Sequence, residues 1–181
     1  MKGSSLGVRV RVMAAFAIAF LSGAVVVFAL AALAGTRVAA MPLDWRIAAA
    51  AVCLFALALV DVLSLRRKTY CLLGLRRQAR QTLTHRQRVE TVAAVWGFDT
   101  GLAVTTFRVG AVTWGALVLT VLGFTSWWSG VVYGIAFTLP LLVFLLTEQS
   151  AERLMGLLQR RPAVQTASAA LLATSGILIA L

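Results

Sequence analysis

Long apolar runs without a single charged residue are the feature that most constrains the fold of this chain. The first run, from Val12 to Ala34, holds 23 residues and no Lys, Arg, Asp or Glu. A helix of about 20 apolar residues is long enough to cross the hydrocarbon core of a bilayer. The whole chain is 61% hydrophobic and only 13% charged, which excludes an ordinary water-soluble domain. The sequence therefore predicts an all-α integral membrane protein, with residues 1–181 forming a single transmembrane domain.

Further apolar runs follow the first one, and together they predict about six transmembrane segments in a helical bundle. The expected segments are residues 12–34, 46–65, 91–107, 109–124, 129–147 and 163–181. The stretch 91–125 is too long for one span and short for two complete spans with a turn, at 1.5 Å of helical rise per residue. We expect a broken or shortened helix there, followed by a second helix from about residue 109.

Basic residues gather in the gaps between the apolar runs. The net charge is +11, from 17 Lys and Arg against 6 Asp and Glu, and eight of the 17 lie between Arg66 and Arg88. Cytoplasmic loops of membrane proteins carry such an excess of basic residues. We expect a multi-pass protein of the inner (cytoplasmic) membrane, with a cytoplasmic N-terminus and a cytoplasmic basic loop at 66–90. This loop is expected to attract anionic lipid headgroups, and nothing in the charge pattern indicates nucleic-acid binding.

Two topologies are compatible with the sequence. Residues 148–161 predict an amphipathic surface helix, because its apolar residues fall on one helical face. Six full spans follow hydropathy best, but they place this helix and its arginines outside. A re-entrant segment at 91–107 leaves five spans and moves the helix inside, which obeys the charge rule better. The sequence leaves this choice open.

The strongest candidate for a functional site lies around Asp99. Charged groups at membrane depth are costly, so they indicate function by default. Asp99 stands between Gly97 and Gly101, which predict a helix break that would face Asp99 into the bundle. Arg108 is the only base in this stretch, and it is the expected counter-charge if the pair is structural. The neighbouring hydroxyl groups expected to line a substrate or ion pathway belong to Thr100, Thr105 and Thr106.

Two further residues complete the candidate pathway. Asp61 lies five residues before Arg66, about 7–8 Å below the headgroup level at helical rise. It either faces the pathway or reaches the interface and pairs with the basic loop. Pro140 interrupts a later span, because proline lacks a backbone donor. It marks either a break in the helix at the site or a packing kink.

The sequence offers little else that carries chemistry. Cys53 lies within an apolar run, while Cys71 and His85 lie in the basic loop, and none has a partner at metal-ligand spacing. We expect no metal and no cofactor. No paired carboxylates, nucleophile–base set, zinc-protease motif or phosphate-binding loop is present, so an enzyme is not expected.

Part of the chain resembles small six-helix transporters of the CcdA/LysE-type superfamily of thiol-electron carriers and exporters. The resemblance rests on Gly97–Arg108 and on the run from Arg160-Arg161-Pro162 to Gly176-Ile-Leu. It implies inverted repeats around a midplane site. Electron carriers of this superfamily use an intramembrane cysteine next to proline, which neither Cys53 nor Cys71 has. The resemblance therefore implies transport without thiol chemistry.

Two functions remain open. The first is a small transporter or carrier with a polar site at a broken helix near the midplane. The second is a non-catalytic structural or accessory subunit of a larger membrane complex. Because 19.3 kDa is small for a self-contained transporter, we expect a homo-oligomer or a membrane protein partner.

Overall fold

The computed structural model describes residues 6–69, 73, 88–103, 110–146 and 160–181. Within these ranges every regular element is a helix, as the sequence predicts. The helices are α1 (Leu6–Val38), α2 (Leu43–Arg66), α3 (Val89–Gly101), α4 (Val112–Val121), α5 (Ser129–Leu146) and α7 (Arg161–Ala180). Three of them, α1, α2 and α7, are long and apolar enough to cross a membrane, which agrees with the predicted membrane protein. The predicted surface helix at 148–161 and most of the basic loop lie outside the described residues.

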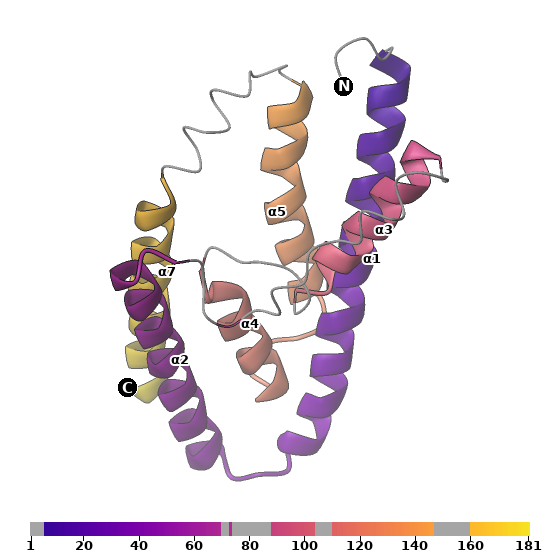
Figure 1. Cartoon of the computed structure of the whole chain (residues 1–181). Coiled ribbons are helices and arrows are strands. Elements are labelled where there is room, and N and C mark those ends of the chain that lie inside the picture. The colour runs from indigo at the N-terminus through magenta and orange to yellow at the C-terminus, as the bar shows by residue number, and fades with distance from the viewer. Residues whose placement is uncertain (1–5, 70–72, 74–87, 104–109, 147–159) are drawn as a thin grey trace.

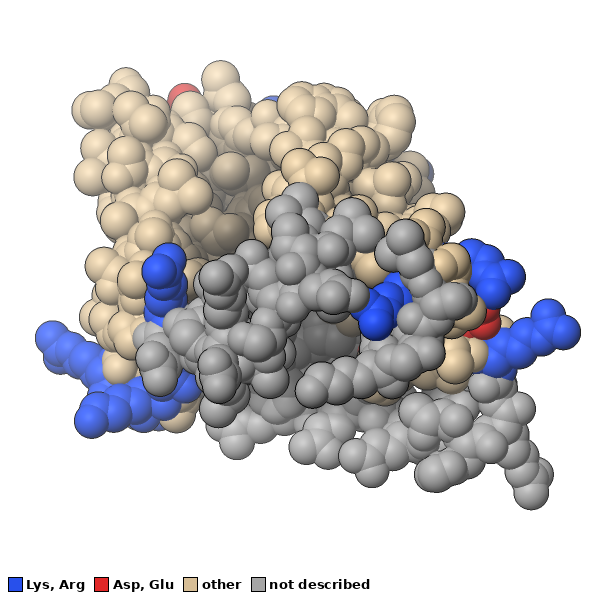
Figure 2. Space-filling model, turned by 90° about the horizontal axis from the view of Figure 1, so that it is seen from above, with Lys and Arg blue, Asp and Glu red and all other residues tan. Residues whose placement is uncertain are grey.

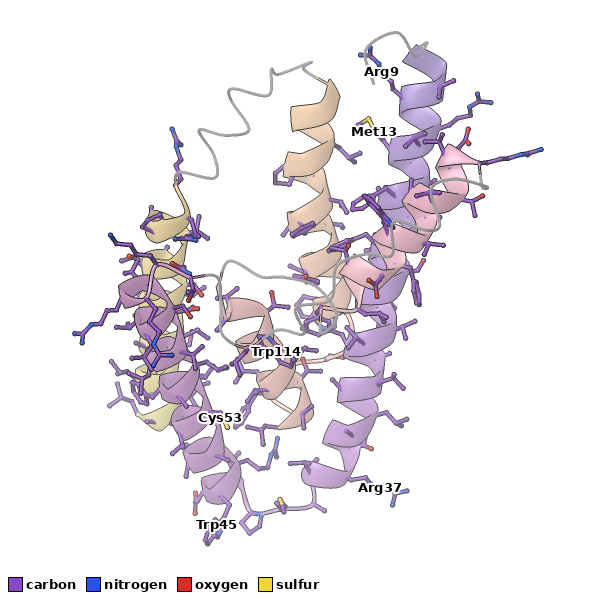
Figure 3. All side chains as sticks on the ribbon, viewed as in Figure 1. Arg9, Met13, Arg37, Trp45, Cys53 and Trp114 are labelled. Atoms are coloured by element: carbon purple, nitrogen blue, oxygen red, sulfur yellow. The ribbon has the colours of Figure 1, made fainter. Side chains whose placement is uncertain are left out.

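The long helices α1 and α2 form the two arms of a V, joined by a short turn (Figure 1). Helices α3 and α5 pack against α1, while α7 packs against α2. Helix α4 lies between the arms and contacts both of them. Arg9 and Arg37 mark opposite ends of α1, and Trp45 lies at the same end as Arg37 (Figure 3). The end that carries Arg9 is shown face-on in Figure 2, with basic side chains around its rim.

Glycines bring α3 into direct contact with the backbone of α1. A Cβ at Gly97 would meet the carbonyl oxygen of Phe16, and a Cβ at Gly101 would lie 2.9 Å from the carbonyl carbon of Phe20. Gly23 of α1 faces α3 in the same way. Small residues four apart allow such close approach of membrane helices. The chain therefore does not break at Gly97: α3 continues through it and ends at Gly101.

The two short helices α3 and α4 follow α1 one after the other. Gly97 of α3 lies beside Phe16, and Gly101 lies beside Phe20, so α3 runs parallel to α1. Helix α4 continues along α1, because its Leu117 packs with Phe28 and Ala31. Near its end, the carbonyl groups of Thr120 and Val121 approach Gly35. The interruption in this stretch thus lies after Gly101 and before Val112.

Helix α5 runs antiparallel to α1 and packs through aromatic rings. Phe137 stacks on Phe20 with ring centroids 4.5 Å apart, and Tyr133 contacts both Phe20 and Phe28. Pro140 lies inside α5, which continues to Leu146. The helix therefore does not end at Pro140, consistent with the tolerance of membrane helices for proline.

Helix α7 runs antiparallel to α2. Gly176 lies against Phe55 and Leu54, whereas at the opposite end the guanidinium of Arg161 donates to the carbonyl oxygen of Lys68 at 2.7 Å. We call this second end, which carries the basic residues that follow α2, the basic end. The C-terminus consequently lies toward the end where α2 begins (Figure 1). An apolar cluster joins α2, α7 and the start of α4. It consists of Leu54, Leu57, Ala58, Ala111 and Leu172.

Candidate functional site

Asp61 of α2 is fully buried, unlike the other acidic residues that the structure describes. Both of its carboxylate oxygens lie 2.9 Å from the backbone nitrogen of Ala111, which donates to them. The hydroxyl of Ser168 on α7 donates to the same carboxylate. Burying a charged group without partners is very costly, and these donors provide the partners. Asp61 therefore does not reach out to the membrane interface.

The position of Ala111 explains why a carboxylate is suited to this place. Ala111 is the N-cap of α4, and α4 has no side-chain cap of its own. The first N–H groups of a helix lack intrahelical acceptors, and the helix dipole places positive charge there. Asp61 supplies negative charge and an acceptor at this end. One side chain thus ties together α2, α7 and the start of α4.

Gly110 allows the chain to pass close to the carboxylate. A Cβ on Gly110 would lie 2.7 Å from the hydroxyl oxygen of Ser168 and 3.4 Å from Oδ2 of Asp61. Any larger residue would have to displace the Asp61–Ser168 contact. The absence of a side chain therefore permits the break between α3 and α4 to lie directly beside Asp61.

The opposite end of α4 is held by the same helix α2. Nε of Arg46 donates to the carbonyl oxygen of Leu122, the C-cap of α4, at 2.8 Å. The guanidinium also lies over the ring of Phe124, 5.2 Å from its centroid. A cation at a helix C-terminus is favourable. Helix α2 thus presents Asp61 to the positive end of α4 and Arg46 to the negative end.

An Arg46→Gln variant is expected to lose about 1 kcal/mol of unfolding free energy, because it removes the cation from the C-terminus of α4. The loss is measured by titrating the protein in mild detergent with sodium dodecyl sulfate and following helicity by circular dichroism. Arg37→Gln is the matched control, since Arg37 is exposed near the same end of the molecule. Equal losses in the two variants would show that the contact with Leu122 contributes nothing.

Buried polar side chains continue from Asp61 toward the basic end. They lie along the contact between α2 and α7, and we call them the polar row. The row comprises Asp61, Ser64 and Thr69 from α2 and its C-terminal extension, and Gln165 and Ser168 from α7. The amide nitrogen of Gln165 donates to the carbonyl oxygen of Thr69 at 2.9 Å, and the hydroxyl of Ser64 donates to the carbonyl oxygen of Val60.

The structure places the predicted pathway residues in different surroundings. Asp99 and Thr100 are half-buried on α3, and the Thr100 hydroxyl donates to the carbonyl oxygen of Trp96. Asp99 is not among the described groups that bond to Asp61. Arg108, Thr105 and Thr106 lie outside the described residues. Asp61 contacts the interruption between α3 and α4 through the backbone N–H of Ala111.

Sequence reasoning missed Ser168 and Gln165, which contribute to this site from α7. Both are polar residues within the last apolar run, three positions apart and therefore on one helical face. Each is buried in the structure, with exposed fractions of 7% and 1%. That spacing was the available signal, because polar residues on one face of an apolar helix indicate a buried polar contact.

Among the described residues, no group of three or more His, Cys, Asp or Glu side chains lies close enough to hold a metal ion. Cys53 is a free thiol on α2 and is partly buried. Cys71 and His85 lie outside the described residues. The chemistry open to this part of the molecule is therefore that of a carboxylate, hydroxyls and an amide.

Comparisons with known proteins leave the function to be argued from this geometry. No family model matches the chain, and searches of curated proteins and of solved structures found no match. The resemblance to the CcdA/LysE-type superfamily accordingly stays a prediction.

Proposed function

We propose that the protein is a small membrane carrier in which the carboxylate of Asp61 binds the transported proton or small cation. The observation that carries this proposal is a fully buried carboxylate at the N-terminus of a half-length helix, beside an interruption of the chain. Carriers build binding sites from such interrupted helices near the midplane. Ionisable residues inside a membrane are costly, and this favours a functional role for Asp61.

The proposed topology has five spans, with α3 and α4 forming the two halves of one broken span. Their successive contacts along α1, in the same direction as α1, support this assignment. The five spans place 14 of the 17 basic residues on the side of the N-terminus and two, Arg37 and Arg46, on the other side. Arg108 falls at the break. By the positive-inside rule, this topology has a cytoplasmic N-terminus, and we propose the inner (cytoplasmic) membrane as its location.

This topology predicts that the C-terminal residue is reached from outside the cell. In a background of Cys53→Ala and Cys71→Ser, a Leu181→Cys variant should react in intact cells with a membrane-impermeant maleimide. An Arg80→Cys variant should react only after the membrane is permeabilised, because it lies in the basic loop. Protection of residue 181 in intact cells would instead agree with six full spans.

Binding at Asp61 provides a way to move α4. The ionised carboxylate is favoured by the N-terminus of α4 and by the Ala111 N–H. A proton or cation bound to the carboxylate competes with these interactions, so the tie between α2 and α4 weakens. The half-helix is then free to shift beside α1. This coupling of occupancy to helix position is what an alternating-access carrier requires.

Reconstituted liposomes test the carrier directly. With a potassium gradient and valinomycin setting the membrane potential, wild-type protein should carry a proton or sodium flux into liposomes that contain a pH-sensitive or sodium-sensitive dye. Asp61→Asn should abolish this flux while the protein stays folded. Asp44→Asn, an identical change at an exposed position of the same helix, should leave it intact. A flux that persists unchanged in Asp61→Asn would refute the proposal.

One observation favours the alternative, an accessory subunit of a membrane complex. The Asp61 carboxylate already joins α2, α4 and α7, so it serves to fix the position of three elements. An accessory subunit would need no flux and would purify with a different polypeptide. Native mass measurement in mild detergent separates the two functions: a monomer or homo-oligomer agrees with the carrier, and a stable hetero-complex agrees with the subunit.

A further inference from the structure

The polar row contains two buried atoms that lack a hydrogen-bond partner in the part of the chain that the structure describes. They are Oε1 of Gln165 and Oγ1 of Thr69. Gln165 is only 1% exposed, and its amide nitrogen already donates to the carbonyl oxygen of Thr69. Native proteins satisfy nearly all buried polar atoms, and where protein groups do not suffice, internal water does. The Thr69 hydroxyl and the Gln165 amide oxygen belong to two residues that are hydrogen-bonded to each other, and both can bind such a water molecule.

The row leads in one direction only. From Asp61 toward the basic end, Ser168 and Ser64 are followed by Gln165 and Thr69. Asp61 and Ser64 on α2, and Gln165 and Ser168 on α7, are each three residues apart, which is about 4.5 Å of helical rise. Thr69 lies beyond the end of α2. The row reaches the exposed contact between Arg161 and Lys68, where the chain meets the polar end of the molecule. Water therefore has hydrogen-bonding groups along the whole way from this end to the carboxylate.

On the other side of Asp61 the same helix contact is apolar. Ala58, Leu57 and Leu54 of α2 pack there against Leu172 of α7. Leu54 and Leu172 are 1% and 3% exposed. Such closely packed apolar side chains offer no partner for water, and dry apolar contacts of this kind exclude it. The change from polar to apolar packing occurs at Asp61 itself.

We propose that the polar row is an aqueous half-path that connects Asp61 to the basic end, with the apolar cluster closing the way beyond it. The inference deepens the proposed carrier and rests on it, because it assigns the side from which Asp61 receives its ligand. The ligand class that this path admits is water together with a proton or a small monovalent cation. Gln165 and Thr69 hold the water nearest to the entrance, and the two serines lie between it and the carboxylate.

Cysteine accessibility tests the half-path without measuring transport. Ser64→Cys and Ala58→Cys are made separately in the background of Cys53→Ala and Cys71→Ser. Both positions are buried on α2, three residues to either side of Asp61, and both changes are small. A small charged methanethiosulfonate reacts with thiolates, which form in water and not in apolar surroundings. Added from the basic end in oriented vesicles, it should modify Ser64→Cys and leave Ala58→Cys unmodified.

A third variant connects the reaction to the unpartnered atoms. Gln165→Leu in the Ser64→Cys background should slow the modification about tenfold, because water at the entrance loses its partner and the thiolate is disfavoured. Thr166→Leu is the control, since Thr166 lies exposed on the outer face of α7. It should leave the rate unchanged.

The outcomes separate the path from the carrier. An unreactive Ser64→Cys, or equal reactivity of Ser64→Cys and Ala58→Cys, would overturn the half-path. An unchanged rate in Gln165→Leu would also overturn it. If the thiol reacts as expected while liposomes show no flux, the carrier fails and the path stands. If flux is present while the thiol is unreactive, the ligand reaches Asp61 by another route and the path fails.

Discussion

An Asp61→Ala variant is expected to lose about 3 kcal/mol of unfolding free energy, because buried donors are left without their charged acceptor. The Ala111 N–H and the Ser168 hydroxyl both donate to this carboxylate. The loss is measured by titration with sodium dodecyl sulfate in mixed micelles, followed by circular dichroism.

A double-mutant cycle measures how much of this loss of unfolding free energy comes from the contact between Asp61 and Ser168. Ser168→Ala alone should cost about 1 kcal/mol, and the double variant should cost less than the sum, because the hydroxyl has no acceptor once the carboxylate is gone. Asp44→Ala is the control at an exposed position of α2. If Asp61→Ala and Asp44→Ala unfold at the same detergent fraction, the Asp61 contacts do not hold the helices together.

Gly101→Ala should destabilise the protein by about 3 kcal/mol, although alanine is the better helix former. The added methyl group would collide with the backbone of Phe20, and backbone atoms cannot turn aside as a flexible side chain does. Helices α1 and α3 must therefore move apart and lose contact along their length. The same unfolding titration measures the effect.

Gly7 provides the matched control for this substitution. It lies in α1, and a Cβ at Gly7 would meet nothing within 4 Å. Gly7→Ala should therefore be neutral or slightly stabilising, by the helix propensity of alanine alone. A Gly101→Ala variant as stable as Gly7→Ala would mean that α3 does not pack on α1 as described.

The sequence predicted the helices well because the bilayer imposes a local rule. A chain in hydrocarbon must satisfy its backbone hydrogen bonds within each helix. An apolar run therefore indicates a helix, and the basic or turn residues that flank the run indicate its ends. The run predicted at 46–65 is α2, Leu43–Arg66, and the run predicted at 163–181 is α7, Arg161–Ala180. The predicted helix at 129–147 likewise corresponds to α5, Ser129–Leu146.

The roles of single residues did not follow the same rule. Gly97 and Gly101 were expected to interrupt a helix, because glycine gives the backbone freedom. Helix α3 ends at Gly101 but continues through Gly97. The absence of a side chain also allows two helices to touch, and both glycines lie against the backbone of α1 at Phe16 and Phe20. Whether a glycine ends a helix or allows a second helix to approach depends on the neighbouring helix, which lies about 80 residues earlier in the chain. The local sequence does not show that neighbour.

Composition and hydropathy alone predicted a helical membrane protein and where most of its described helices lie, because the cost of exposing polar groups to lipid acts on each segment separately. Tertiary structure decided which carboxylate is buried at the break. Asp61 is held by an N–H 50 residues away and a hydroxyl 107 residues away. A buried charge is tolerated only where folding brings donors to it, so the position of Asp61 became clear only once α2, α4 and α7 were placed together.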